Sequence, residues 1–423
     1  MSRTVSAWVT SGGEFLGVAG PFPVDSPWWS EVEPVIARLS ELLGIATLVL
    51  RLVDVDGGGG GRDGHVTYHV EALERPVPGL LKRQSVDQGL LHDHQVLRSP
   101  WARADGLREL LDWAAGTLAS AGRPVTGPVE QRRTWNLAGL FRLPTARGTV
   151  WLKTTPHFAA DEATVAGAFA GVDPDLVAAV LGSGEHRILM EHIPGEDCWR
   201  ASPETIASVM ERFVAAQSAL ASSTPAAADE NRIRDWRAPV LTARIHELLA
   251  GPVALELSAQ ELANARELTR RWNLLAECGL PDTLVHGDFH PGNWRGDGGS
   301  PVVVDFADAH WGNPVLDGLR VQDFLPESHR ARAARAWIDA WQARLPAADP
   351  ARALAIAEPL AHLTYAVRYQ EFLDGIEPSE WPYHRGDPAD EIRAAVRCAE
   401  KPSPHLAGRS SCARGAISRA ATR

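Results

Sequence analysis

Residues 284–293 are Leu-Val-His-Gly-Asp-Phe-His-Pro-Gly-Asn, and after a glycine-rich turn residues 302–306 are Val-Val-Val-Asp-Phe. An apolar strand therefore leads into a polar loop, and a second apolar strand ends on an aspartate. Asp288, Asn293 and Asp305 follow one another at spacings of five and twelve residues. Their oxygens suit Mg²⁺, which keeps several waters and binds through one or two carboxylates together with substrate phosphates. The segment therefore predicts a magnesium and phosphate site.

This segment resembles the catalytic loop of the aminoglycoside phosphotransferase family, which shares the protein-kinase fold. The small-molecule-kinase pattern His-Gly-Asp-x-x-x-x-Asn fits residues 286–293 at every defined position. The resemblance implies that Asp288 is the base that accepts the proton of the acceptor hydroxyl, and that His286 braces the loop. It also implies that Asn293 and Asp305 hold Mg²⁺.

Two neighbouring features extend the resemblance. Residues 312–317, Gly-Asn-Pro-Val-Leu-Asp, match the family's trailing Gly-x-Pro-x-x-Asp element, which implies a structural role for Asp317. Ala307 follows Asp305-Phe306 where protein kinases have a glycine. We interpret this departure as the loss of a loop that can flip, with metal binding kept.

A nucleotide-binding half is expected upstream, and Lys153 is its strongest residue. It lies in the apolar segment Val-Trp-Leu-Lys-Thr, where a charge is costly unless it is paired. The other lysines, Lys82 and Lys401, lie outside the kinase-like region, although the chain has 42 Lys and Arg residues. The resemblance implies that Lys153 contacts the α- and β-phosphates. Glu162 is its expected ion-pair partner, with Asp161 as the alternative.

The rest of the nucleotide site is predicted from backbone groups. Residues 188–195, Ile-Leu-Met-Glu-His-Ile-Pro-Gly, resemble the linker between the two lobes of the family. The carbonyl of Glu191 and the N–H of Ile193 are expected to bind the base, so the sequence leaves ATP and GTP equally open. Residues 136–139, which end on Gly139, either cover the phosphates or form an ordinary hairpin turn.

The acceptor site is predicted to lie between the catalytic loop and the C-terminal helices. Aromatic faces and carboxylates suit sugars, nucleosides and amino groups. The weak candidates from three sequence clusters are Asp308, Trp311, Tyr365, Tyr369, Trp381 and Tyr383. For each of them, a place in the core or in a connector is the competing interpretation.

The predicted fold class is α+β: a bilobal protein-kinase-like fold with an antiparallel-sheet N-lobe, a helical C-lobe and an extra N-terminal α+β domain. The predicted segments are an N-terminal domain at 1–125, an N-lobe and hinge at 126–195, a C-lobe at 196–400 and a disordered tail at 401–423. The N-lobe strands are predicted at 129–135, 139–144, 148–154 and 187–193, after which come helices at 203–222, 239–249, 258–278, 329–343, 351–374 and 389–399. The N-terminal domain is expected to pack on the nucleotide lobe or to mediate dimerisation, so a homodimer is one partner left open.

Composition excludes several other classes of protein. The formal net charge of −11 argues against a nucleic-acid binder, and the 45% hydrophobic fraction argues against wholesale disorder. The four cysteines are far apart, and neither a membrane span nor a signal-peptide core is evident. The sequence thus predicts a cytoplasmic protein whose partner is a small-molecule hydroxyl acceptor.

Three functions remain open at this point. The first is Mg²⁺-dependent O-phosphorylation of an antibiotic, an aminoglycoside or a sugar-bearing nucleoside, which would confer resistance. The Arg-rich composition favours it, because it fits an actinobacterium-like producer. The second is a metabolic kinase for an amino sugar, a sugar or an amino alcohol. The third is a nucleotide-binding regulator without transferase activity.

Overall fold

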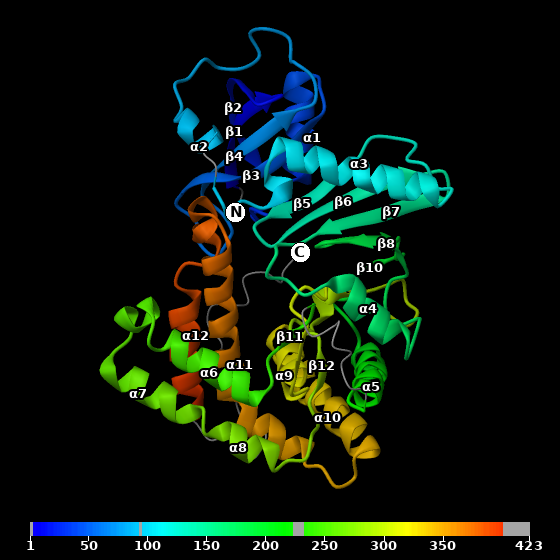
Figure 1. Ribbon diagram of the computed structural model, residues 1–423, viewed down its shortest axis with the longest axis vertical. Coiled ribbons are helices and arrows are strands. Elements are labelled where there is room, and N and C mark those ends of the chain that lie inside the picture. The colour runs from blue at the N-terminus through cyan, green and yellow to red at the C-terminus, as the bar shows by residue number, and fades with distance from the viewer. Residues whose placement is uncertain (1–2, 93–94, 223–231, 401–423) are drawn as a thin grey trace. The chain divides into compact units, whose positions relative to one another are not determined.

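The computed structural model describes residues 3–92, 95–222 and 232–400 (Figure 1). The predicted tail at 401–423 lies outside the described residues. The chain divides into two compact units. Unit 1 comprises Met1–Phe158, Leu181–His192 and Phe372–Arg385, and unit 2 comprises Ala159–Val180, Ile193–Glu371 and the chain from Gly386 onward. Within the described ranges no helix is both long enough and apolar enough to cross a membrane.

Unit 1 begins with a four-stranded mixed sheet in the order β2-β1-β4-β3. Its elements are β1 (Arg3–Ser11), β2 (Glu14–Val24), β3 (Thr47–Asp56) and β4 (His65–Ala72), together with α1 (Glu33–Leu43). Strands β1 and β4 are parallel, and the other pairs are antiparallel. Alternate residues of β1 are buried on one face, where Val35 and Leu39 of α1 join them in one core. The predicted extra N-terminal α+β domain is therefore confirmed.

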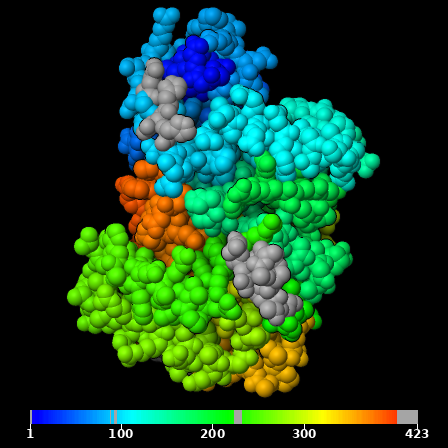
Figure 2. Space-filling model, viewed as in Figure 1, coloured from blue at the N-terminus to red at the C-terminus, as the bar shows by residue number. Residues whose placement is uncertain are grey.

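A second sheet in unit 1 is the predicted nucleotide-lobe sheet. Its five strands have the order β5-β6-β7-β9-β8, with antiparallel pairing from β5 through β9. They are β5 (Glu130–Trp135), β6 (Ala138–Thr145), β7 (Gly148–Thr154), β8 (Val180–Gly184) and β9 (Arg187–Glu191). Helix α3 (Ala104–Ser120) covers one face of this sheet and packs Leu107 and Leu110 against Phe141 and Val150 (Figure 1). The outward side of α3, in cyan, forms part of the surface of this unit (Figure 2).

The two sheets of unit 1 are joined by hydrogen bonds. The side-chain amide of Gln131 donates to the carbonyl of Val49 at 2.7 Å and accepts from its N–H at 2.8 Å, so β5 is tied to β3. The 3₁₀ helix η4 (Pro378–Tyr383) adds a second connection, because a Glu380 oxygen accepts from the N–H of Leu52 at 2.8 Å. Of the two roles left open for the N-terminal domain, packing on the nucleotide-lobe sheet is thus observed.

Unit 2 is mainly helical, as predicted for the C-lobe. Its helices are α4 (Glu162–Ala170), α5 (Pro203–Leu220), α6 (Ala238–Leu248), α7 (Ala259–Leu268), α8 (Arg271–Ala276), α9 (Val315–Asp323), α10 (Glu327–Arg344), α11 (Pro350–Gly375, whose last turn belongs to unit 1) and α12 (Asp387–Ala399). The helix predicted at 258–278 is broken into α7 and α8, and α9 was not predicted. The boundaries between the four predicted segments stay a proposal.

Short strands and helices complete the described elements. In unit 2, β10 (Glu196–Asp197), β13 (Trp294–Gly296) and β14 (Val302–Val303) form one sheet, and β11 (Arg234–Asp235), β15 (His310–Gly312) and β12 (Thr283–Val285) form another. The remaining helices are α2 (Gln88–His92), η1 (Pro100–Ala102), η2 (Pro252–Glu256) and η3 (Pro291–Asn293). Phe213 of α5 stacks on Phe289 with ring centroids 4.2 Å apart, which anchors the loop between β12 and β13 to the helical core.

The bond pair between Gln131 and Val49 predicts a stability effect. Gln131→Ala leaves a buried N–H and a buried carbonyl of Val49 without partners, so the free energy of unfolding should fall by about 1–3 kcal/mol. Urea unfolding measures this change. Arg142→Ala is the control, because it removes only an exposed ion pair with Glu130 and should cost well below about 1 kcal/mol. Equal effects of the two variants would contradict this account.

Candidate active site

Two short segments of unit 2 carry the motif residues: the loop that follows β12, and the hairpin of β13 and β14. Trp294 pairs with Val303 across β13 and β14, and the N–H of Val304 donates to the carbonyl of Asn293 at 2.9 Å. Asn293 thus faces the residue before Asp305. The twelve-residue spacing is therefore the length of a hairpin whose two ends carry the two predicted metal ligands.

The loop before this hairpin is held by a buried carboxylate from α9. Asp317 accepts the N–H of His286 at 2.9 Å and the N–H of Gly287 at 3.0 Å, one at each oxygen. The Gln217 amide of α5 donates to the same carboxylate at 2.8 Å. Because buried backbone N–H groups need partners, Asp317 fixes the backbone of this loop, in agreement with its predicted structural role.

Gly287 has a backbone that requires glycine. Its φ is +85°, and a Cβ atom at this position would lie 2.2 Å from the carbonyl oxygen of Asp308. The chain before Asp288 therefore passes directly against the segment that follows Asp305. This close approach explains the glycine of the His-Gly-Asp motif in physical terms.

His286 is buried, and its hydrogen bonds define its tautomer. Its Nδ1 accepts from the N–H of Asp288 at 3.2 Å, so Nε2 bears the proton and donates to the carbonyl of Val304 at 3.0 Å. Burial lowers the pKa of His286, which favours this neutral ring. His286 thus joins the loop to Val304, directly after β14, and its bracing role stays a prediction.

Asp288 has partners at both carboxylate oxygens. Arg320 Nε donates to Oδ1 at 2.7 Å, while His290 Nε2 and Asn293 Nδ2 lie 3.3 and 3.2 Å from Oδ2. Burial alone would raise the pKa of Asp288, but Arg320 and His290 hold it well below its ordinary value. The side chain is still 27% exposed, so an ionised carboxylate remains accessible to an acceptor.

The donor set fits a magnesium ion. Asn293 Nδ2 donates to the carbonyl of Asp288 at 2.9 Å, which leaves the amide oxygen as its metal-binding atom. Asp305 is exposed and has φ of +67°, a left-handed conformation that aspartate tolerates better than most residues. One carboxylate oxygen and one amide oxygen, together with waters and phosphates, form the kind of ligand set that Mg²⁺ prefers. In the described part of the chain, no cluster of three or more His, Cys, Asp or Glu residues offers another metal site.

Asp161 and Glu162 have different partners in unit 2. Asp161 caps α4 by accepting the N–H of Thr164 at 3.0 Å, and it pairs with Arg232 at 3.1 Å. Glu162 is buried, and its Oε2 accepts the N–H of Phe306 at 3.0 Å. Glu162 is thus held beside the Asp305-Phe306 segment, and its pairing with Lys153 stays a prediction.

The predicted nucleotide residues lie in both units. Lys153 is buried in β7, opposite Ile188 of β9. Glu191 ends β9 and pairs with Arg123 at 2.5 Å, while the Ile193 carbonyl accepts from Arg295 Nε at 3.1 Å. The division between units falls between His192 and Ile193, inside the predicted linker.

The turn between β5 and β6 is a two-residue hairpin, because Trp135 pairs with Ala138. Gly139 lies in β6, beyond this turn, where Thr154 and Trp101 leave little space for a side chain. The turn residue Asn136 is buried, and its Oδ1 lies 3.1 Å from His384 Nε2. An ordinary hairpin describes this turn, and a phosphate role for Gly139 stays a prediction.

The acceptor candidates fall into two groups. Four of them lie in unit 2, namely Asp308, Trp311, Tyr365 and Tyr369, and the other two, Trp381 and Tyr383, lie in unit 1. Arg368 pairs with Asp308, Tyr365 is buried, and Trp311 and Tyr369 are half-buried.

Tyr383 and Trp381 differ in their surroundings. Tyr383 is buried in the core of the N-terminal sheet, where its ring lies edge-on to Trp29 at 5.3 Å. Its position agrees with the competing interpretation, a place in the core, and an acceptor role for it stays a prediction. Trp381 is 37% exposed and donates to the carbonyl of Leu373 at 3.0 Å.

Sequence reasoning missed Arg320 and the aromatic residues around the loop. His290 stacks between Trp199 at 5.1 Å and Phe324 at 4.1 Å. The only available signal for Arg320 was its spacing of three residues from Asp317, which places both on one side of a helix.

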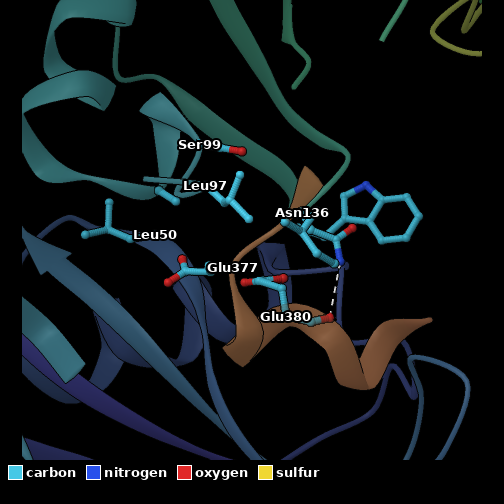
Figure 3. Close-up of a pocket in the computed structure, with 9 residues that line it drawn as sticks. Leu50, Leu97, Ser99, Asn136, Glu377 and Glu380 are labelled. Atoms are coloured by element: carbon cyan, nitrogen blue, oxygen red, sulfur yellow. Dashed lines mark hydrogen bonds between the residues drawn. The ribbon is translucent and has the colours of Figure 1, made fainter. Parts of the chain in front are cut away.

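A small pocket in unit 1 contains none of the predicted site residues. It is lined by Leu50, Leu97, Ser99, Ala102, Trp135, Asn136, Ile376, Glu377 and Glu380. Figure 3 shows the side chains of Glu377 and Glu380 extending from the 376–380 segment toward Leu50. Glu377 is paired with Arg98 at 2.9 Å, whereas Glu380 Oε2 is buried without a hydrogen-bond partner. Burial, and then the charge of Glu377, raise the pKa of Glu380 to about 8.

Comparisons with known proteins agree with this geometry. Residues 131–356, more than half of the chain, match the model of the phosphotransferase enzyme family (APH). A choline/ethanolamine kinase family protein from Mesorhizobium loti is similar in structure, with 19% identity, 70% of this chain and 98% of that chain covered, and a TM-score of 0.52. A putative fructosamine-3-kinase from Thermobifida fusca is 21% identical to this chain, with a TM-score of 0.46. The match covers 67% of this chain and 98% of that chain. No curated protein sequence matches. The similarity to the first of these two structures shows that this chain has the predicted protein-kinase-like fold.

The backbone of Gly287 yields a prediction with an internal control. Gly287→Ala adds both the strain of a positive φ and a clash with the carbonyl of Asp308. Gly298→Ala adds only the strain, because φ is +105° there and the space is open. Gly298→Ala should cost about 1–2 kcal/mol of stability, and Gly287→Ala should cost clearly more. Thermal unfolding of the two variants measures the difference, and equal melting temperatures would refute it.

Glu380 predicts a pH dependence of stability. Because its folded pKa is raised, the folded state binds a proton that the unfolded state releases between the ordinary value of 4.5 and about 8. The contribution of this group is therefore fully present below pH 4.5 and is lost as pH rises to about 8. Glu380→Gln mimics the protonated acid and should exceed wild type in melting temperature at high pH but not at low pH.

If the difference in melting temperature between Glu380→Gln and wild type stays constant with pH, the raised pKa assigned to Glu380 is contradicted. Glu130→Gln is the control, because Glu130 is exposed and does not line this pocket, so this variant should not exceed wild type in melting temperature at high pH.

Proposed function

Because the chain belongs to the phosphotransferase enzyme family (APH), we propose that it transfers the γ-phosphoryl group of a Mg-nucleotide to a hydroxyl group of an antibiotic. The family establishes a small-molecule phosphotransferase, and it implies ATP as the donor. An aminoglycoside or a sugar-bearing nucleoside is the proposed acceptor, and resistance is the proposed consequence. A phosphotransferase activity takes the place of the third function considered from sequence, a nucleotide-binding regulator without transferase activity.

The observation that supports the reaction most directly is the state of Asp288. It is ionised, fixed by hydrogen bonds at both oxygens, and partly exposed at the centre of the loop. A carboxylate in this state can orient an acceptor hydroxyl and accept its proton as the new bond forms. Most of the rate gain in such a reaction comes from positioning and charge neutralisation.

The other roles are proposed from the residues that match the family's motifs. Asn293 and Asp305 are proposed to hold Mg²⁺, which when bound would neutralise charge on the transferred phosphates. Lys153, with Glu162, is proposed to fix the α- and β-phosphates, and backbone groups of Glu191 and Ile193 are proposed to bind the base. Because these contacts use backbone groups, GTP remains a second donor within the proposal.

The acceptor is proposed from the residues that accompany the loop in unit 2. Trp311 and Tyr369 are half-buried aromatic residues that suit the apolar faces of sugars. Phe324 and Tyr365 could form a cage for a quaternary ammonium group, but they already hold the guanidinium of Arg320 at 4.5 and 4.6 Å. This arrangement favours a sugar-bearing acceptor over a quaternary amine.

One observation favours a metabolic sugar kinase as the second candidate. Aminoglycosides carry several ammonium groups, which are best recognised by carboxylates without another cationic partner. Asp308 already pairs with Arg368. Burial alone would raise the pKa of Asp308, but Arg368 holds this pKa below its ordinary value. A neutral sugar would need no such carboxylate.

The proposal is tested with an acceptor panel of aminoglycosides, nucleoside antibiotics, amino sugars and neutral sugars. ADP release and mass detection of an added phosphate would identify the acceptor. Expression in a susceptible host, with the inhibitory concentration of the drug as the readout, would separate resistance from metabolism. Wild-type protein that binds ATP and Mg²⁺ but phosphorylates no member of any class would contradict the proposal.

Asp288→Ala supplies the residue-level prediction. It should lower kcat by at least about 10²-fold, because the hydroxyl loses the group that orients and deprotonates it, whereas ATP affinity should persist. Calorimetry of ATP binding and steady-state kinetics measure both quantities. Asp339→Ala, a change on α10 of unit 2, is the control, and near-normal turnover of Asp288→Ala would refute the assignment.

A further inference from the structure

Helix α9 contacts the loop through two residues that are three positions apart. Asp317 accepts backbone N–H groups of the loop at 2.9 and 3.0 Å, and Arg320 donates to the side chain of Asp288 at 2.7 Å. One rigid element thus holds both the backbone and the side chain of the same segment. The bond to Arg320 is also shorter than the contacts that His290 and Asn293 make to the other oxygen, at 3.3 and 3.2 Å.

The guanidinium of Arg320 is itself tightly confined. It lies over the rings of Phe324 and Tyr365 at 4.5 and 4.6 Å, and Asp323 lies 3.7 Å from Nη1. Its side chain is 9% exposed. Two aromatic rings fix the plane of the guanidinium, so the direction of its N–H bonds toward Asp288 is fixed too. Lysine has no planar group that could be oriented in this way.

This confinement matters because the other side-chain contacts of the Asp288 carboxylate, from His290 and Asn293, are longer and both reach Oδ2. A carboxylate that orients a hydroxyl for in-line transfer loses much of its effect when it is displaced by about 1 Å. Arg320 is held by groups on α9 and α11, neither of which belongs to the loop itself. It can therefore define the position of the carboxylate independently of the loop.

We propose that Arg320 is a positioning residue for phosphoryl transfer, which fixes the Asp288 carboxylate toward the acceptor hydroxyl through the guanidinium clamped by Phe324 and Tyr365. This inference rests on the proposed function of Asp288. It concerns a residue that does not itself touch the acceptor or the nucleotide.

The test compares Arg320→Ala and Arg320→Lys with wild type and with Arg212→Ala. Arg212 pairs with Asp173 at 2.8 Å in the same unit without touching the loop, so it controls for the loss of an Arg–Asp pair. Rates are measured as ADP release from ATP. The acceptor is either water or the panel compound that the wild-type protein phosphorylates. Arg320→Ala should lose about 100-fold in kcat, with KM for ATP unchanged, and Arg320→Lys should fall between it and wild type. Arg212→Ala should keep the wild-type kcat.

Chemical rescue separates positioning from a merely structural role. Methylguanidinium, at millimolar concentrations far below those that unfold proteins, can occupy the space between Phe324 and Tyr365 in Arg320→Ala. It should raise kcat of that variant and of no other. An Arg320→Ala variant with wild-type kcat, or a folded one that is slow and not rescued, would overturn the inference.

A crystal structure of Arg320→Ala tests the inference without any activity. The Asp288 carboxylate should leave its wild-type position, while the backbone bonds from His286 and Gly287 to Asp317 remain. An unmoved carboxylate would overturn the inference even if the wild-type protein phosphorylated nothing. A wild type that is inactive on every acceptor, together with a displaced Asp288 in the variant, would instead count against the proposed function alone.

Discussion

The bond pair from His286 and Gly287 to Asp317 is the interaction on which the rest of the site depends. Two successive backbone N–H groups are buried here, and each would cost about 1–3 kcal/mol if it had no acceptor. A carboxylate has two oxygens and can accept both bonds, and Asp317 does so at 2.9 and 3.0 Å. Gly287 has its positive φ at this point, and the chain continues from it directly into Asp288.

The interaction also determines what else can lie nearby. Gly287 passes so close to Asp308 that the segment after Asp305 packs directly against the loop. That segment is held in turn, since the carbonyl of Ala307 accepts from Ala160 at 2.9 Å and from Arg234 at 2.8 Å. Ala307 takes the place of the glycine found in protein kinases, and these bonds agree with a segment that keeps one conformation.

Unit 1 has a different organisation, because it is assembled from three separate stretches of the chain. The N-terminal sheet reaches the nucleotide-lobe sheet through Gln131, and the segment around η4 returns from the far end of the sequence to join both. Asn136 in the β5–β6 turn donates to the carbonyl of Glu380 at 3.4 Å and lies 3.1 Å from His384. The conformation of a turn at the predicted nucleotide site therefore depends on residues more than 240 positions later.

The sequence by itself determined the elements with local signals: four of the five strands of the nucleotide-lobe sheet within a few residues, with β8 not predicted, and the loop from His286 to Asn293. It did not predict α9, because eight of its nine residues are buried, and they include Asp317, Arg320 and Gln322, which a sequence pattern would place on a solvent-exposed face. It also left Tyr383 open between the acceptor site and the core, and the structure places this residue in a core. Only the tertiary structure decided the pairs Arg320–Asp288 and Gln131–Val49. Such contacts depend on which buried surfaces pack together over the whole chain, and no local pattern of residues specifies that.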